Sequence, residues 1–254
     1  MDKSTQSRLH GYLDELRLTT TRKRYSDIAQ KARKDIWGYE EYLLSVVQEE
    51  SETRRAKRIE RLLRQSGLPL EKSLDTFELK RLPNKVRQQL NVLLEGRFLD
   101  YSENILIFGN PGSGKTHLIC AVGQELIRQD KRVYFITCAL LLQELLAAKR
   151  DLKLPKLFKK LNHYHAIIID DIGYVHQAKE EMEVLFTLLA QRYEQGSVMI
   201  TSNLPFSKWE KIFKDPVMTA AAIDRIVHHS IILELNIPSY RMAMAKNRKI
   251  QERR

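Results

Sequence analysis

The spacing of hydrophobic and polar positions changes character once along the chain, near residue 67. Up to about residue 66 the apolar residues recur with helical periodicity, and this stretch contains no proline. Gly67 and Pro69 then break the pattern, as residues that end helices do. We therefore expect a small all-helical N-terminal domain over residues 1–68 and a second domain over residues 69–254.

Short runs rich in β-branched residues alternate with helical stretches in the second domain. The five runs are Asn104–Phe108, Arg132–Thr137, His165–Asp170, Ser197–Thr201 and Ser230–Leu235. Strands that are separated by helices form parallel sheets, and helices then cover both faces of the sheet. The pattern predicts an α/β fold with a five-stranded parallel sheet.

A glycine-rich motif follows the first of these runs directly. It has the pattern GxxxxGK followed by Ser or Thr, and its residues are Gly109, Asn110, Pro111, Gly112, Ser113, Gly114, Lys115 and Thr116. In such a loop, backbone N–H groups and the positive end of the following helix bind phosphates. We expect Lys115 to reach the β- and γ-phosphates of ATP and the Thr116 hydroxyl to bind Mg²⁺.

Two carboxylates end the third run, whose residues 166–169 are all apolar. Asp170 would hold Mg²⁺ through water, and Asp171 could orient or deprotonate the water that attacks the γ-phosphate. The alternative is a pair of aspartates that only forms a turn with Gly173. The phosphate-binding motif elsewhere in the same domain favours the metal site.

Two later residues are candidates for contacts with the phosphates. Asn203 follows the fourth run, where its amide could point at the γ-phosphate or the attacking water, although it could equally lie in a turn or cap a helix. Arg225 lies in a helical stretch before the fifth run. Its permanent charge could stabilise the phosphoryl group bound by a neighbouring subunit, or it could form a surface ion pair.

Composition indicates the class of partner. The 254 residues are 43% apolar and 30% charged, which is typical of a globular protein. Lys and Arg number 43 against 32 Asp and Glu, which leaves a net charge of +11. This excess favours a polyanionic partner, although such a charge can also serve solubility alone.

Basic residues gather in two clusters that could bind DNA phosphates without reading the bases. On a helix, the first cluster falls within an arc of about 120° and consists of Arg54, Lys57, Arg58, Arg61 and Arg64. The opposite side, which we expect to pack, carries Ala56, Ile59, Leu62 and Leu63. The second cluster consists of Lys149, Arg150, Lys153, Lys156, Lys159 and Lys160. Either cluster could instead be a solvated surface.

Cysteine content and hydropathy predict the compartment. Cys120 and Cys138 lie among apolar residues without CxxC spacing, which is typical of buried thiols in a reducing environment. No apolar run approaches the ~20 residues that a membrane span needs. We expect a cytoplasmic protein without a membrane segment.

Five segments of the chain resemble one protein family. They read GNPGSGKTH, IIIDDIGY, RYEQGSVMITSNLPFSKW, AAIDRIVHH and PSYR, and they are similar to the IstB family, the ATP-binding helper proteins of IS21-type insertion sequences. This family belongs to the AAA+ ATPases and is related to the helicase loader DnaC. The resemblance implies ATP-dependent self-assembly on duplex DNA and a partner transposase that performs the strand chemistry. It also implies that Asp170 is the Walker B metal acid, Asn203 is sensor 1 and Arg225 is an arginine finger acting in trans.

The chain departs from the AAA+ pattern at two places. Position 171 is Asp where many AAA+ proteins carry Glu, so its carboxylate lies one methylene further from the water and we expect slow hydrolysis. Only 13 residues follow Arg241, too few for the helical lid that usually carries sensor 2, so Arg241 remains only a candidate for that role. The alternative functions are a DnaC-like helicase loader, a small-molecule kinase and a DNA-packaging protein that ignores ATP.

Overall fold

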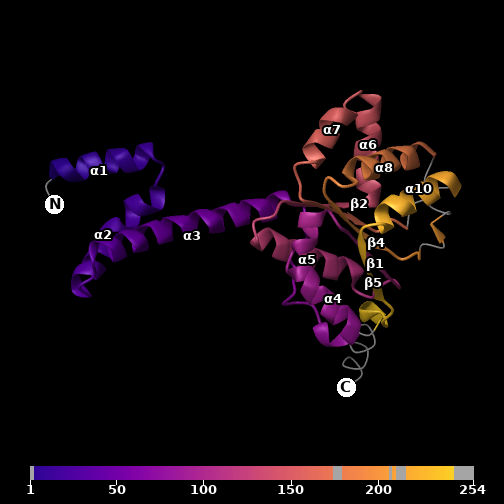
Figure 1. Cartoon of the computed structure of the whole chain (residues 1–254), viewed down its shortest axis with the longest axis horizontal. Helices are drawn as coiled ribbons and strands as arrows, with labels where there is room; N and C mark the ends of the chain where they lie inside the picture. Colours follow the sequence, from indigo (N-terminus) through magenta and orange to yellow (C-terminus); the bar gives the residue numbers. More distant parts are fainter. Residues whose placement is uncertain (1–2, 174–178, 206–207, 210–215, 243–254) are drawn as a thin grey trace, which may run out of the picture. The chain divides into compact units, whose positions relative to one another are not determined.

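The computed structural model describes residues 3–173, 179–205, 208–209 and 216–242 of the chain (Figure 1). The chain divides into two compact units, Met1–Arg61 and Leu62–Arg254. The boundary between them falls inside a long helix that ends at Gln65. Each unit is described by itself below.

Three helices form the first unit. They are α1 (Lys3–Glu15), α2 (Thr19–Lys34) and the greater part of α3 (Tyr39–Gln65). Among the described residues of this unit the buried apolar side chains are few, namely Leu13, Ile28, Ala32 and Val46. Such a small core makes the polar contacts between the helices important for the unit's stability.

A buried carboxylate ties α2 to α3. Glu50 accepts hydrogen bonds from the Thr21 N–H (2.7 Å), the Thr21 hydroxyl (3.1 Å) and Arg54 Nε (2.8 Å). Burial acts to raise the pKa of Glu50, but these hydrogen bonds outweigh it, so the pKa lies below its ordinary value. Arg54 also donates through Nη2 to the carbonyl oxygen of Arg17 (2.6 Å). Arg54 therefore belongs to the internal polar network of this unit.

The packing of α3 differs from the expectation for its basic stretch. Ala56, expected to pack opposite the basic residues, is exposed, and Ile59 is only half-buried. The buried side chains of α3 are Val46 and Glu50. Hydrogen bonds join the first half of α3, which contains these two residues, to α2. The Tyr42 hydroxyl donates to a backbone carbonyl of α2, and Glu50 accepts from a backbone N–H of α2. The stretch around Ala56 lies beyond these contacts and gains no burial from them.

The second unit is built on a five-stranded parallel sheet, which confirms the predicted fold class. Its strand order is β2-β3-β4-β1-β5, and every neighbouring pair runs parallel. The strands are β1 (Asn104–Gly109), β2 (Val133–Thr137), β3 (Ala166–Asp170), β4 (Ser197–Ser202) and β5 (Ser230–Leu235). β2 and β3 each start one residue later than predicted. Just before them the His165 N–H donates to the Arg132 carbonyl (2.8 Å), and the Arg132 N–H donates to the side-chain Nδ1 of His165 (2.8 Å) instead of to a strand carbonyl.

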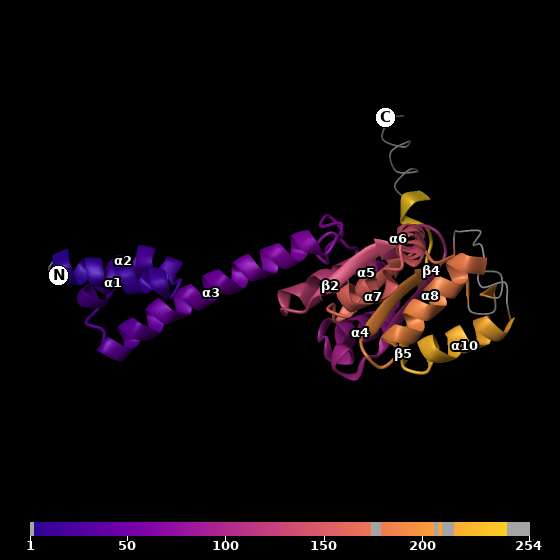
Figure 2. The ribbon, with the colours of Figure 1, turned by 90° about the horizontal axis from the view of Figure 1, so that it is seen from above.

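Helices cover both faces of this sheet (Figure 2). On one face, Gly123 of α5 (Lys115–Arg128) packs against Ile168 of β3, and α4 (Asn84–Leu94) contacts α5. The other face carries α6 (Cys138–Arg150), α7 (Leu154–Leu161), α8 (Lys179–Arg192) and α10 (Pro216–Val227). Two short 3-10 helices, η1 (Leu79–Arg81) and η2 (Arg97–Tyr101), precede β1. Across the described ranges, no helix combines the length and apolar character needed to cross a membrane.

Aliphatic residues in the central strands explain this arrangement. Ile167, Ile168 and Ile169 of β3 are all fully buried, because a strand covered by helices on both faces has no solvent-exposed side. Parallel strands end at the same edge of a sheet, so the last residues of β1, β3 and β4 lie close together. That edge brings together the glycine-rich loop, the aspartate pair and the end of β4.

Candidate nucleotide-binding site

The glycine-rich loop connects β1 to α5 at this carboxyl edge of the sheet. Gly112 (φ 78°) and Gly114 (φ 98°) adopt left-handed backbone conformations, which glycine takes without strain. A Cβ at Gly112 would also collide with the Ser239 hydroxyl, so a larger residue does not fit there. α5 begins at Lys115 directly after the loop, and the free N–H groups of its first turn form a site for phosphates.

Lys115 lies inside the loop and is almost fully buried (5% exposed). Its ammonium donates hydrogen bonds to the carbonyl oxygens of Gly109 (2.9 Å) and Asn110 (3.2 Å). Burial lowers the pKa of Lys115, while the charges of Asp171 and Asp170 act to raise it. This position suits a lysine that binds the β- and γ-phosphates of a nucleotide.

Asp170 is the meeting point of three elements. Its Oδ1 accepts one hydrogen bond from the Thr116 hydroxyl of α5 (3.0 Å) and another from the Thr201 hydroxyl of β4 (2.5 Å). A hydroxyl and a carboxylate are hard oxygen donors, which Mg²⁺ prefers, and Mg²⁺ keeps several waters when it binds only one or two carboxylates. Thr116 and Asp170 therefore fit a magnesium site.

Thr201 is a site residue that the sequence pattern did not indicate. It is fully buried, and the same hydroxyl that donates to Asp170 accepts a hydrogen bond from the N–H of Asp171 (2.9 Å). One side chain therefore holds both aspartates. The only signal in the sequence is a hydroxyl residue at the end of a predicted strand, and the strand order is needed to show that this strand lies beside β3.

Asp171 has a backbone conformation that is uncommon outside glycine, with φ 60°. Its side chain is half-buried and faces the cavity of the glycine-rich loop. Burial and the charge of Asp170 raise the pKa of Asp171, while Lys115, Arg241 and Lys72 act to lower it. A carboxylate with a raised pKa accepts a proton from water more readily than an ordinary aspartate does.

A cavity of about 250 Å³ opens at the glycine-rich loop. Lys115, Thr116, Asp171 and Arg241 all line it, so the structure brings these predicted site residues together. Two further segments, residues 72–81 and 237–241, complete the lining. Their lining residues, besides Arg241, are Lys72, Thr76, Phe77, Glu78, Arg81, Ile237 and Tyr240. The backbone of the second segment is joined to the loop, because the Tyr240 N–H donates to the Gly112 carbonyl (2.9 Å).

Asn203 lies next to the aspartate pair rather than in the cavity lining. It is half-buried, and its Oδ1 is buried without a hydrogen-bond partner among the residues that the structure describes. A Cβ at Gly173 would collide with this oxygen, so Asn203 lies against the segment that follows Asp171. Its side chain lies against Gly173 and makes no hydrogen bond to either aspartate within the described ranges.

Arg225 lies at the amino edge of the sheet, away from the glycine-rich loop. It is half-buried on α10, and its guanidinium carbon lies 4.8 Å from the centre of the Phe186 ring on α8. It lines a second cavity, of about 190 Å³, with Asn104 at the start of β1. Within the described part of the chain its Nη1 is buried without a hydrogen-bond partner. Because Gly109 ends the strand that Asn104 begins, Arg225 does not complete the site of its own subunit.

Comparisons with known proteins agree with a nucleotide site of this kind. The sequence profile of the IstB-like ATP binding protein family matches residues 11–248. This chain belongs to that family. It is 39% identical, over 96% of its length, to a Sinorhizobium fredii protein assigned as an insertion sequence ATP-binding protein, of which 82% is covered. It is 35% identical, over 97% of its length, to a Geobacillus stearothermophilus protein assigned as the ATP-binding protein of insertion sequence IS5376, of which 97% is covered.

Solved structures of DNA replication proteins share the fold of this IstB-like chain. The crystal structure of the DnaC helicase loader matches it with a TM-score of 0.57 at 19% sequence identity, over 66% of this chain and 97% of that one. The structure of AMPPCP-bound DnaA from Aquifex aeolicus matches with a TM-score of 0.55 at 17% identity, over 73% of this chain and 56% of that one. At these identities the likeness shows a shared fold alone.

The two basic clusters of the IstB-like chain are exposed, but several members are engaged in ion pairs. Arg54 pairs with Glu50, as described above. The exposed members of the first cluster are Arg54, Lys57, Arg58, Arg61 and Arg64. In the second cluster Lys149 pairs with Glu183 (3.4 Å) and Lys153 with Asp151 (3.0 Å). Arg150 and Lys156 are exposed as well.

Proposed function

We propose that this IstB-like protein is a Mg²⁺-dependent ATPase that assembles on duplex DNA when it binds ATP and regulates a partner transposase. The observation that carries the proposal is the joining of Thr116, Asp170 and Asp171 at the cavity of the glycine-rich loop. The relatives assigned as insertion sequence ATP-binding proteins support a role beside a transposase. The two cysteines are buried and form no disulfide among the described residues, which suits a cytoplasmic protein.

Each residue of the site has a role in this proposal. The loop Gly109–Thr116 binds the phosphates of ATP, with the Lys115 ammonium on the β- and γ-phosphates. Thr116 and Asp170 hold Mg²⁺, which neutralises charge on the phosphates when it is bound. Asp171 orients or deprotonates the attacking water, and Asn203 contacts the γ-phosphate or that water. Arg241 contributes a further positive charge to the cavity.

Arg225 completes the site of a neighbouring subunit in this proposal. Its place at the amino edge of the sheet supports a role in trans, because the ATP of its own subunit binds at the carboxyl edge. A permanent positive charge there stabilises the phosphoryl group that is transferred to water. Shared sites of this kind require a homo-oligomer, and ATP binding then promotes assembly.

The basic clusters supply the contacts with DNA in this proposal. Their exposed side chains and the net charge of +11 suit a polyanion. Contacts with phosphates give affinity that falls with salt and carry little sequence information. The proposed DNA contacts of the first cluster are Arg54, Lys57, Arg58, Arg61 and Arg64. Those of the second cluster are Lys149, Arg150, Lys153 and Lys156.

Analytical ultracentrifugation of protein–DNA mixtures tests this proposal. Full-length protein is mixed with duplex or single-stranded DNA of equal length, with either a non-hydrolysable ATP analogue or ADP. We expect large complexes on duplex DNA with the analogue, and small species with ADP. Assembly on single strands in preference to duplex DNA would instead favour a helicase loader.

Two variants separate ATP binding from hydrolysis in the same experiment. Lys115→Ala removes the ammonium that binds the phosphates, so assembly should fail. Asp171→Asn keeps the shape of the side chain and loses the base. This variant should assemble on DNA with ATP, hydrolyse ATP slowly and leave the DNA more slowly than the wild type. Equal loss of assembly in both variants would contradict the proposal that ATP binding is the switch.

A further inference from the structure

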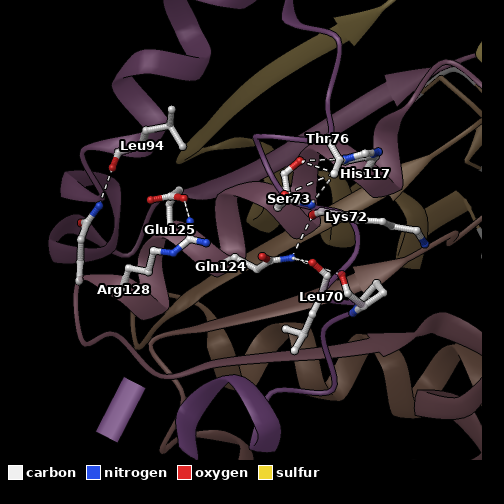
Figure 3. Close-up of polar contacts among 11 residues, drawn as sticks. Leu70, Lys72, Ser73, Thr76, Leu94, His117, Gln124, Glu125 and Arg128 are labelled. Carbon is white, nitrogen blue, oxygen red and sulfur yellow. Dashed lines mark hydrogen bonds and ion pairs between the residues drawn. The ribbon is translucent and has the colours of Figure 1, made fainter. Parts of the chain in front are cut away.

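Residues 69–81, which we call the strap, run along the helix of the glycine-rich loop. Gln124 of α5 is buried, and its Nε2 lies within hydrogen-bonding distance of the backbone carbonyl oxygens of Pro69 (3.3 Å), Leu70 (3.3 Å) and Lys72 (3.0 Å). Figure 3 shows this amide directed at the strap. One buried side chain of α5 therefore holds the backbone from Pro69 to Lys72 itself.

His117 provides the second attachment of the strap to α5. Its Nε2 lies 2.9 Å from the Ser73 carbonyl oxygen and 3.2 Å from the Thr76 hydroxyl (Figure 3). A carbonyl oxygen only accepts, so the Nε2–H donates to Ser73. The ring also meets Phe77 edge to face, with centroids 5.1 Å apart. His117 directly follows Thr116, so the strap is attached to the same turn of helix that carries the phosphate ligands.

Lys72 lies where these two attachments meet and lines the nucleotide cavity together with Lys115 and Asp171. Its side chain extends away from Gln124 (Figure 3). In the proposed function Lys115 binds the β- and γ-phosphates and Asp171 faces the attacking water, so Lys72 shares its cavity with the groups that meet the terminal phosphate. Within the described ranges no ion pair occupies this ammonium.

We propose that Lys72 is a second phosphate-binding lysine, which contacts the terminal phosphate of a nucleoside triphosphate in its own subunit. Gln124 and His117 are positioning residues, because they hold the backbone at Lys72 and directly after it. The inference rests on the proposed function, since it assumes that ATP occupies this cavity. The charges support it: four basic residues line the cavity against two acidic ones, Glu78 and Asp171, and this positive excess suits a polyanionic ligand.

The test is the affinity of the full-length protein for a non-hydrolysable ATP analogue and for ADP, measured by calorimetry with Mg²⁺ and without DNA. Lys72→Gln should weaken binding of the analogue by about tenfold to a hundredfold, the range expected for a charged hydrogen bond. Binding of ADP should weaken at most about threefold, because only a longer-range attraction is lost. Lys72→Arg should retain most of the affinity. Lys80→Gln, an exposed lysine of the strap outside the cavity lining, is the matched control.

The outcomes separate this inference from the proposed function. If Lys115→Ala abolishes nucleotide binding but Lys72→Gln leaves it unchanged, the inference is wrong and the ATP site stands. Equal weakening of the analogue and ADP by Lys72→Gln would also overturn a contact with the terminal phosphate. If Lys115→Ala binds the analogue as tightly as the wild type, the ATP site itself is misplaced.

Gln124→Leu tests the positioning role with the same two ligands. Gln124→Leu should reduce the preference for the analogue over ADP, as Lys72→Gln does. The double variant with both substitutions should show the same preference as Lys72→Gln alone. A merely structural role would lower the melting temperature and leave the preference unchanged. Additive losses in the double variant would show that Gln124 does not act through Lys72.

Discussion

Replacing Thr201 with Val removes one hydroxyl and keeps the shape of a fully buried side chain. Asp170 then loses a charge-assisted hydrogen bond of 2.5 Å, and such bonds contribute about 1.5–3 kcal/mol. The N–H of Asp171 loses its acceptor at 2.9 Å, and an unsatisfied buried N–H costs about 1–3 kcal/mol. Water that reaches the cavity side relieves part of this loss, so we expect the free energy of unfolding to fall by about 3 kcal/mol.

Differential scanning calorimetry and ATP hydrolysis measure the two consequences. For a unit of this size each kcal/mol corresponds to about 2–4 °C, so the melting temperature of Thr201→Val should fall by about 6–12 °C. Hydrolysis should fall as well, because the hydroxyl orients both aspartates. Thr201→Ser is the matched control, since it keeps the hydroxyl and loses one methyl group, which costs about 1 kcal/mol. Equal melting temperatures and equal rates for the Val and Ser variants would refute this reasoning.

Two further predictions concern the basic helix and the buried thiols. Replacing Arg58, Arg61 and Arg64 with Gln should weaken DNA binding at every sequence and flatten the slope of log K against log[salt] by up to about 0.9 per lost phosphate contact. An unchanged slope in salt titrations would show that this face is only solvated. Burial raises the pKa of Cys120 and Cys138 from 9.0 to about 12, so iodoacetamide at pH 8 should modify both thiols in urea and neither in the folded protein. Because the pKa of each thiol is higher in the folded than in the unfolded protein, the protonated thiols contribute to the free energy of unfolding. That contribution is complete below pH 9 and is lost toward pH 12. A free energy of unfolding in urea that stays constant over this pH range would contradict the prediction.

The strands and the glycine-rich loop could be predicted because short stretches of sequence decide them. The three consecutive isoleucines Ile167–Ile169 indicate a strand that is covered on both faces, and β3 is such a strand. The loop residues are contiguous, and the left-handed conformations at Gly112 and Gly114 need glycine at those places. Local sequence therefore predicts the parallel sheet and the phosphate loop.

The contacts that complete the site join residues far apart in the sequence. Thr201 meets Asp170 only because β4 lies beside β3, which depends on the strand order. Gln124 bonds to carbonyl groups 52 to 55 residues earlier in the chain, and no local pattern marks such a pair. The exposure of Ala56 was mispredicted for the same reason, because helical periodicity shows which residues share a face but not whether a neighbour covers that face.

Mixing two inactive variants tests most directly whether the ATP sites are shared between subunits. A subunit with Arg225→Ala keeps a sound loop of its own but spoils the site of its neighbour, and Lys115→Ala does the reverse. Each variant alone should be nearly inactive, since removal of an arginine finger costs about 10³–10⁵ in rate. ATP hydrolysis is measured with duplex DNA at equal total protein. The account predicts that the mixture exceeds the sum of the two separate variants, because some interfaces pair an intact Lys115 with an intact Arg225. Co-assembly of the two variants without any such gain would contradict it.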